Sequence, residues 1–409
     1  MIRKPCCYLP ALFVLLTGAC SATANRDRTQ PVSIPAPSLR GSLFENDLEQ
    51  PAVVCPPPSY ESTTGAFPVI YYLPGFTTDV TEYIDRSIDG LHMGESMDRL
   101  IATGAAREAI IVIVNGRNFL GGSFYVNSPV TGNWEDFVVK DVVSYVDRTY
   151  RTIRAPSARG IAGDSMGGFG AVHTAMRHPE VFGAVYAISP ALAAPGGLSK
   201  SPMLAPDKVE AYLLTEPELR RLSPDEGERE LRELMDELYA SHYRFHYYRA
   251  MVYAYGAAFA FDVHAPPAYI DFPFERTVAG IVETQESLRR FEVGFGDLDE
   301  KVRANEANLR RLRGIALDWG KNDRHRWIVE GCEHFAALLR AAGIAVEVRI
   351  HDGGHTDRLR ESIESHALPF LSEHLASSSS GLTPTSAHGR MVPAADVSLR
   401  EPQRKDERS

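Results

Sequence analysis

Residues 159 to 170 read RGIAGDSMGGFG. The apolar run that ends before Gly163 is typical of a short buried strand, and the small residues after Ser165 suit a helix packed closely on that strand. The pattern Gly-x-Ser-x-Gly at a strand-to-helix turn is typical of a nucleophilic serine, because the flanking glycines remove side chains that would collide in a strained turn. The sequence therefore predicts that Ser165 is a nucleophile at the end of a sheet strand.

Short apolar runs alternate with helical segments on both sides of this stretch. Strands are predicted at residues 69–73, 109–114, 158–162, 182–188, 315–319 and 345–350, and helices at 134–150, 166–176, 335–342 and 361–375. This alternation predicts βαβ units around a mostly parallel sheet flanked by helices. It stops between about residues 196 and 312, where charged helical segments enclose an aromatic-rich middle. We expect this interval to be a large, mainly helical cap inserted over the site.

A serine hydroxyl needs a base to remove its proton and an acid to orient that base. After a nucleophile at such a turn, the acid and then the histidine follow in chain order. Asp323 lies just beyond the predicted strand 315–319, and His355 follows the glycine pair that ends the strand 345–350. We therefore predict Asp323 as the acid and His355 as the base. Asp318, which lies within a strand, is the less favoured acid.

The negatively charged oxygen that forms during acyl transfer needs two preorganised N–H donors. The amide of Met166 follows the nucleophile directly and is the first predicted donor. The turn after the strand 69–73 is expected to supply the second, from the amide of Phe76. Pro74 in the same turn has no N–H to offer.

Composition argues against several other kinds of site. The chain has 409 residues and a formal net charge of −10, and it has no basic stripe of the kind that nucleic acid binding requires. The histidine pairs His351/His355 and His242/His246 are not expected to bind metal, because the first lies in a glycine loop and the second lacks an intervening Glu. No metal or organic cofactor is predicted. Cys55 and Cys332 are too isolated in sequence for their pairing to be predicted.

Both ends of the chain are predicted to lie outside the folded domain, 39–375. Residues 1–24 have a short basic region and an apolar run typical of a signal peptide, so we expect export. Cys20 lies in a lipobox-like segment and would then be lipidated and attach the protein to a membrane, whereas Ala22-Thr23-Ala24 offers an ordinary cleavage site. Residues 25–38 are polar and Pro-rich and are interpreted as a linker. Residues 376–409 are interpreted as a disordered tail.

Four segments together resemble the Putative esterase family of α/β-hydrolases. They are residues 68–76 (PVIYYLPGF), 127–136 (NSPVTGNWED), 163–170 (GDSMGGFG) and 353–355 (GGH). The family includes S-formylglutathione hydrolases, feruloyl, acetylxylan and enterobactin esterases, and mycobacterial mycolyltransferases. The resemblance covers about residues 41–375. The chain departs from the family at Pro74, where His or Asp is usual.

The resemblance implies an α/β-hydrolase fold and ester hydrolysis through an acyl-enzyme on Ser165, with a small-molecule ester as substrate. It also implies that Asn133, Trp134 and Glu135 line the cleft; their other interpretation is that Asn133 caps a helix and Trp134 packs at its start. Two alternatives to a hydrolase stay open: an acyltransferase with the same triad, and an inactive protein that binds a sugar or lipid. The sequence determines neither the substrate nor the oligomeric state.

Overall fold

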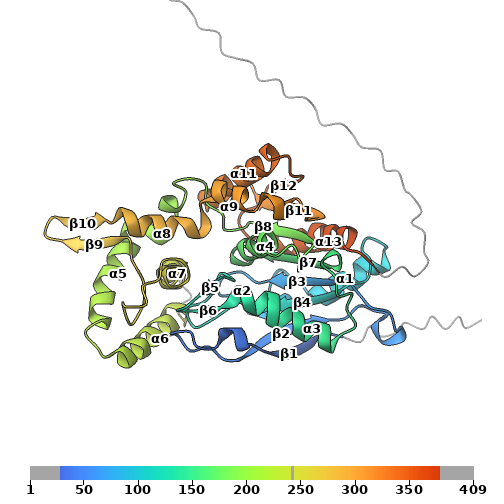
Figure 1. Ribbon diagram of the computed structural model, residues 1–409, viewed down its shortest axis with the longest axis horizontal. Helices are drawn as coiled ribbons and strands as arrows, with labels where there is room; N and C mark the ends of the chain where they lie inside the picture. The colour runs from blue at the N-terminus through green and yellow to red at the C-terminus, as the bar shows by residue number, and fades with distance from the viewer. Residues whose placement is uncertain (1–27, 241–243, 378–409) are drawn as a thin grey trace, which may run out of the picture. The chain divides into compact units, whose positions relative to one another are not determined.

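An eight-stranded sheet forms the centre of the protein in a computed structural model that describes residues 28–240 and 244–377 (Figure 1). Its strand order is β1-β2-β4-β3-β7-β8-β11-β12. The strands are β1 (Gln30–Pro35), β2 (Glu49–Cys55), β3 (Val69–Leu73), β4 (Ile110–Val114), β7 (Arg159–Asp164), β8 (Ala184–Ile188), β11 (Gly314–Gly320) and β12 (Glu347–His351). The pairs β1–β2 and β2–β4 are antiparallel and the other pairs are parallel. The predicted α/β-hydrolase architecture is confirmed.

Helices cover both faces of the sheet. Every residue of the central strands β3, β4 and β8 is therefore buried, whichever face its side chain points to. On β3, Tyr71 belongs to one apolar cluster and Tyr72 to the other. The cluster around Tyr71 includes side chains of α3 (Val143–Thr149), α4 (Met166–Arg177) and α11 (Arg326–Ala341). The cluster around Tyr72 includes side chains of α1 (Met93–Ala102), α12 (Leu359–Glu361) and α13 (Leu368–His374). Short π-helical turns join α2 (Trp134–Asp136) to α3 and α12 to α13.

The interpretation of residues 25–38 as a linker is wrong for most of that segment. Residues 30–35 form β1, which pairs along its length with β2, and Ile34 is fully buried. The prolines misled the prediction, because an edge strand leaves half of its N–H groups unpaired and so tolerates proline at those positions. The predicted signal peptide with Cys20 and nearly all of the predicted tail lie outside the described residues.

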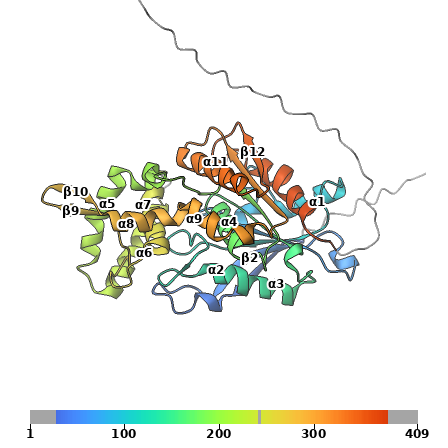
Figure 2. The same ribbon diagram turned by 45° about the horizontal axis from the view of Figure 1, so that its top comes forward.

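The predicted cap is present as an insertion between β8 and β11, but it is shorter than expected. It contains α5 (Pro206–Leu219), α6 (Pro224–Ala240), α7 (Arg244–Phe259), α8 (Gln285–Phe295) and a hairpin of β9 (Phe274–Thr277) and β10 (Gly280–Glu283) that was not predicted. Helix α7 contacts α5, α6 and α8, and β9 lies beside α5 (Figures 1 and 2). The helices α9 (Leu298–Ala304) and α10 (Glu306–Leu309) instead pack on α11 and α4. They therefore belong to the layer that flanks the sheet.

A second small hairpin, β5 (Asn127–Ser128) with β6 (Gly132–Asn133), precedes α2. Ser128 connects it to the cap, because its hydroxyl donates to the Ala257 carbonyl of α7 at 2.7 Å. Within the described residues, no helix combines the length and apolar character that a membrane crossing requires.

Helix α4 packs so closely on the end of β3 that only glycine fits at the contact. A Cβ atom at Gly167 would lie 1.8 Å from the carbonyl oxygen of Leu73. Relief would require the helix to move away from the strand, and the turn that holds Ser165 would move with it.

We predict that Gly167→Ala lowers the free energy of unfolding by about 3 kcal/mol, because the methyl group overpacks a rigid backbone contact. Urea unfolding monitored by circular dichroism measures this change. The matched control is Gly65→Ala, where an added Cβ meets nothing within 4 Å. Equal stabilities of the two variants would contradict the proposed close packing.

Candidate active site

Ser165 occupies a strained backbone position between β7 and α4. Its φ is 53° and its ψ is −112°, which a non-glycine residue adopts only when its surroundings impose it. The Ser165 amide donates to the carbonyl of Ile188 on β8 at 2.9 Å. A Cβ at Gly163 would lie 2.4 Å from the Gly167 carbonyl, so the turn needs glycine there. This is the geometry expected of a nucleophile elbow.

The structure brings the three predicted catalytic side chains together. The Ser165 hydroxyl donates to His355 Nε2 at 2.9 Å, and His355 Nδ1–H donates to Asp323 Oδ2 at 2.6 Å. Asp323 is fully buried, and its other oxygen accepts from the His325 amide at 2.8 Å. Burial alone would raise the pKa of Asp323, but these hydrogen bonds hold it below its ordinary value. An ionised carboxylate thus orients the imidazole toward the serine.

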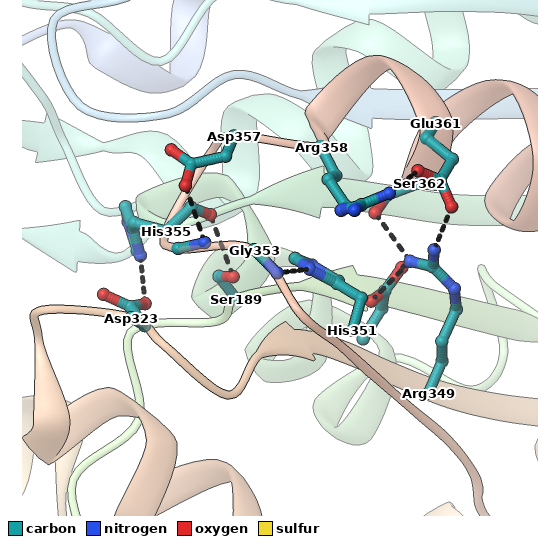
Figure 3. A network of polar contacts seen from close by, with 12 residues as sticks. Ser189, Asp323, Arg349, His351, Gly353, His355, Asp357, Arg358, Glu361 and Ser362 are labelled. Carbon is teal, nitrogen blue, oxygen red and sulfur yellow. Dashed lines mark hydrogen bonds and ion pairs between the residues drawn. The ribbon is translucent and has the colours of Figure 1, made fainter.

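Hydrogen bonds within and around the loop after β12 fix the position of His355 (Figure 3). The Ser189 hydroxyl donates to the His355 carbonyl at 3.1 Å. The Gly353 amide donates to His351 Nδ1 at 3.0 Å, and the Gly354 amide donates to Asp357 at 2.8 Å. His351, the last residue of β12, is therefore a loop anchor.

Asp318 has different partners from Asp323, although both are fully buried on or just after β11. Its two oxygens accept from Arg349 Nη1 at 2.8 and 3.0 Å, and the Tyr186 hydroxyl donates to it at 3.1 Å. Arg349 also binds Glu361 and the Ser362 hydroxyl (Figure 3). Asp318 thus ties β11 and β12 to the C-terminal helices and makes no hydrogen bond to His355.

Phe76 and Met166, the predicted oxyanion donors, both line the cavity that contains Ser165. The neighbouring amides are used, because Thr77 donates to the Gly121 carbonyl and Thr78 to the Gly75 carbonyl. Within residues 28–240 and 244–377, neither the Phe76 amide nor the Met166 amide has a backbone acceptor. Neither N–H group is therefore committed to a backbone carbonyl of the described chain, as the predicted role requires.

A buried polar network below the turn at Phe76 was not predicted from the sequence. Asp164 accepts from the hydroxyls of Tyr72 at 2.9 Å and Tyr83 at 2.5 Å. Tyr83 in turn accepts from the Gly75 amide at 3.4 Å, and the Tyr125 hydroxyl donates to the Pro74 carbonyl at 3.0 Å. These contacts hold the turn through the backbone of Pro74 and Gly75.

The cavity beside Ser165 has a volume of about 490 Å³ and mainly apolar walls. Cap helix α7 supplies Tyr247, Tyr248 and Met251, and α8 supplies Phe295. The remaining lining residues are Phe76, Ser165, Met166, Ala191, Pro202, Arg324, His325, Trp327, Ile328, His355 and Thr356. Some of the cap aromatics thus face the site, and others, such as Tyr253 and Tyr255, are buried within the cap.

Arg324 and His325 were missed, although they directly follow the predicted acid. The His325 ring lies 4.9 Å from the His355 ring, centroid to centroid. Burial lowers the pKa of His325 to about 4, so its ring is neutral near pH 7. The sequence could have indicated both residues, because they follow the carboxyl end of a predicted strand. Binding sites of α/β proteins commonly lie at this edge of the sheet.

Asp323, His325 and His355 are close enough to be considered as metal ligands, since their ligand atoms lie within 4.8 Å of one another. However, His355 and Asp323 are hydrogen-bonded to each other, and the Arg324 guanidinium donates to His325. A permanent positive charge against one of three ligands opposes cation binding. The donor set therefore fits an acid–base pair better than a metal centre.

None of the residues that the resemblance placed in the cleft lines this cavity. Asn133 is exposed and makes no side-chain cap, and Trp134 is fully buried with its indole N–H donating to the Thr131 carbonyl at 2.7 Å. Glu135 is buried against α4, where it binds Arg177, His173 and His178. The Trp134 packing predicted by the second interpretation agrees with the structure. The structure does not agree with a capping role for Asn133, or with cleft roles for Asn133, Trp134 and Glu135.

Cys55 and Cys332 form no disulfide with each other. Cys55 lies on β2, whereas Cys332 is buried on α11, and its thiol donates to the Pro190 carbonyl at 3.6 Å.

The strained serine, the histidine and the buried carboxylate, placed at the carboxyl edge of this sheet, define the class of serine hydrolases with the α/β-hydrolase fold. A family model described as Putative esterase matches residues 49–378, and the chain belongs to this family.

Comparisons with individual proteins agree with this family. Esterases of two Mycobacterium tuberculosis strains are 28% identical to the chain over 127 residues, which cover 30% of this chain and 25% of theirs. The match therefore spans only a quarter of the length of these curated relatives. The fold is similar to that of a ferulic acid esterase, with a TM-score of 0.53 and 21% identity over 85% of this chain and 98% of that one. It is also similar to an S-formylglutathione hydrolase from Agrobacterium tumefaciens, with a TM-score of 0.50 and 16% identity over 85% and 95% of the chains.

The surroundings of Glu135 predict a pH-dependent contribution to stability. Burial alone would raise the pKa of Glu135, but hydrogen bonds from His173, His178 and Arg177 hold it far below its ordinary value. This contribution is full above the unfolded pKa, near 4, and is lost as the pH falls. The hydrogen bond to Glu135 raises the pKa of His178. The contribution of His178 to the free energy of unfolding is therefore full below about pH 6.5 and is lost as the pH rises.

We predict that Glu135→Gln lowers the free energy of unfolding by about 3 kcal/mol near pH 5.5, because it breaks a buried ionic cluster. The loss should be smaller at pH 8 and smallest at pH 3. Urea unfolding at the three pH values measures it. Glu180→Gln, which removes an exposed partner of His178, is the control and should cost less than about 1 kcal/mol. A loss independent of pH would contradict the ionic role of Glu135.

Proposed function

We propose that the protein is a serine carboxylic ester hydrolase that works through an acyl-enzyme on Ser165. The observation that carries this proposal is the continuous hydrogen-bond relay from the Ser165 hydroxyl through His355 to Asp323, at 2.9 and 2.6 Å. Membership of the Putative esterase family supports the choice of carboxylic esters as substrates.

In the first half of the proposed reaction, Ser165 Oγ attacks the ester carbonyl carbon and its proton passes to His355 Nε2. The ionised Asp323 stabilises the imidazolium that forms. The Phe76 and Met166 amides donate to the negatively charged oxygen of the tetrahedral intermediate. The intermediate collapses, the carbon–oxygen bond to the alcohol breaks, and His355 returns its proton to the departing alcohol.

In the second half, a water molecule attacks the acyl carbon while His355 removes its proton. Collapse of this second intermediate breaks the bond to Ser165 Oγ, which regains a proton from His355, and releases the carboxylic acid. The apolar cavity under α7 and α8 is suited to an apolar part of the ester, because its burial there removes apolar surface from water.

The test is the hydrolysis of a p-nitrophenyl ester series from acetate to palmitate by the wild-type protein and Ser165→Ala. We expect Ser165→Ala to lower kcat/KM at least about 10⁴-fold, because the nucleophile is removed. Ser62→Ala, at an exposed serine away from the cavity, is the matched control and should leave turnover unchanged. Turnover retained by folded Ser165→Ala would refute the assignment of the nucleophile. A folded wild-type protein that hydrolyses no ester would refute the hydrolase.

The same assay separates the two buried aspartates of the β11 region. Asp323→Asn should lower kcat by about 10³- to 10⁴-fold, because an amide no longer stabilises the imidazolium. Asp318→Asn should act mainly on the free energy of unfolding, because it leaves Arg349 without its buried partner. The reverse order of kcat values would move the acid to position 318.

A further inference from the structure

The walls of the cavity beside Ser165 carry one permanently charged side chain, that of Arg324. Among the described residues that line it, none is Asp, Glu or Lys. The catalytic carboxylate of Asp323 is fully buried and is already bonded to His355. A negative charge on a bound molecule would therefore meet the Arg324 guanidinium, and no carboxylate of the lining would repel it.

Arg324 has few partners within the protein. Its Nε–H donates to His325 Nε2 at 3.2 Å. Within residues 28–240 and 244–377, no carboxylate lies within ion-pair distance of its guanidinium. The side chain is exposed, and the rest of its donor groups are available to a ligand. Arg326, two residues later, differs because it points back to its own loop, where it donates to the Lys321 carbonyl at 2.8 Å.

His325 lies between Arg324 and Tyr248 and contacts both. Because His325 Nε2 accepts from Arg324, the neutral ring carries its hydrogen on Nδ1. Nδ1 lies 2.7 Å from the Tyr248 hydroxyl oxygen, whereas Nε2 lies farther from the same oxygen, at 3.2 Å. These two distances place the Tyr248 oxygen beside the ring edge between the two nitrogens, off the direction of the Nδ1–H bond, so the Tyr248 hydroxyl is engaged with His325. Arg324 lines the cavity, so its free donors serve this space.

We propose that Arg324 forms an anion-binding subsite beside Ser165, and that the ester hydrolysed here carries a carboxylate or similar oxyanion on an otherwise apolar body. This inference rests on the proposed ester hydrolysis for its substrate class. A planar guanidinium binds a carboxylate through two parallel hydrogen bonds. Tyr247, Met251 and Phe295 supply apolar walls for the rest of the molecule.

The experiment measures binding to Ser165→Ala, so its outcome does not depend on turnover. Two pairs of ligands exchange a carboxylate for a neutral amide of similar size: 4-butanoyloxybenzoate against 4-butanoyloxybenzamide, with the charge on the alcohol side, and monophenyl glutarate against phenyl 5-amino-5-oxopentanoate, with the charge on the acyl side. Isothermal titration calorimetry gives the Kd of each ligand. The second variants, made in the Ser165→Ala background, are Arg324→Gln and the control Arg326→Gln.

In at least one pair, the anionic ester should bind about ten-fold or more tightly than its neutral partner. Arg324→Gln should abolish this ratio, and Arg326→Gln should preserve it. Ratios near one in both pairs, or a ratio that survives Arg324→Gln, would overturn the subsite. Turnover of the same esters by the wild-type protein is measured separately. If Kd depends on the ligand's charge but no ester is turned over, the proposed hydrolase activity is refuted and the proposed anion subsite stands.

Discussion

The active-site arrangement depends on one backbone constraint, the reversal of the chain at Ser165 between β7 and α4. The positive φ of Ser165 is maintained only because α4 lies directly against the end of β3, with Gly167 beside the Leu73 carbonyl. The same contact places the Met166 amide near the turn that contains Phe76. Nucleophile and oxyanion donors are therefore positioned by a single packing contact between a strand and a helix, before any catalytic hydrogen bond is considered.

Buried carboxylates have distinct tasks around this turn because their partners differ. Asp323 is oriented toward His355, and Asp318 holds Arg349 between β12 and the C-terminal helices. Asp164 accepts from two tyrosines below the oxyanion turn, and Glu135 fastens α2 to α4. Of these four carboxylates, Asp323 is the one that accepts a hydrogen bond from His355, the histidine beside Ser165. The chemistry of each carboxylate follows from its neighbours and could not be assigned from residue type alone.

Much of the fold and of the site could be predicted from local patterns. The strand 69–73, the turn at Ser165 and the loop positions of Asp323 and His355 depend on short-range signals and chain order. Residues 30–35 and Glu135 could not be predicted correctly, because β1 is determined by its pairing with β2, and Glu135 by α4, 38 or more residues away. The cap boundary was misplaced because α9 and α10 have the same charged, amphipathic pattern as the cap helices. The contact of His325 with Tyr248 joins residues that are 77 positions apart in the chain, so no local pattern indicates it.

Active-site labelling shows whether the strained turn makes Ser165 a covalent nucleophile. The folded protein is treated with a fluorophosphonate, and the adduct is located by mass spectrometry of its peptides. We expect one equivalent of label, attached to Ser165 and strongly slowed by Asp323→Asn. A label on another residue, or no label on a protein shown to be folded, would contradict this expectation.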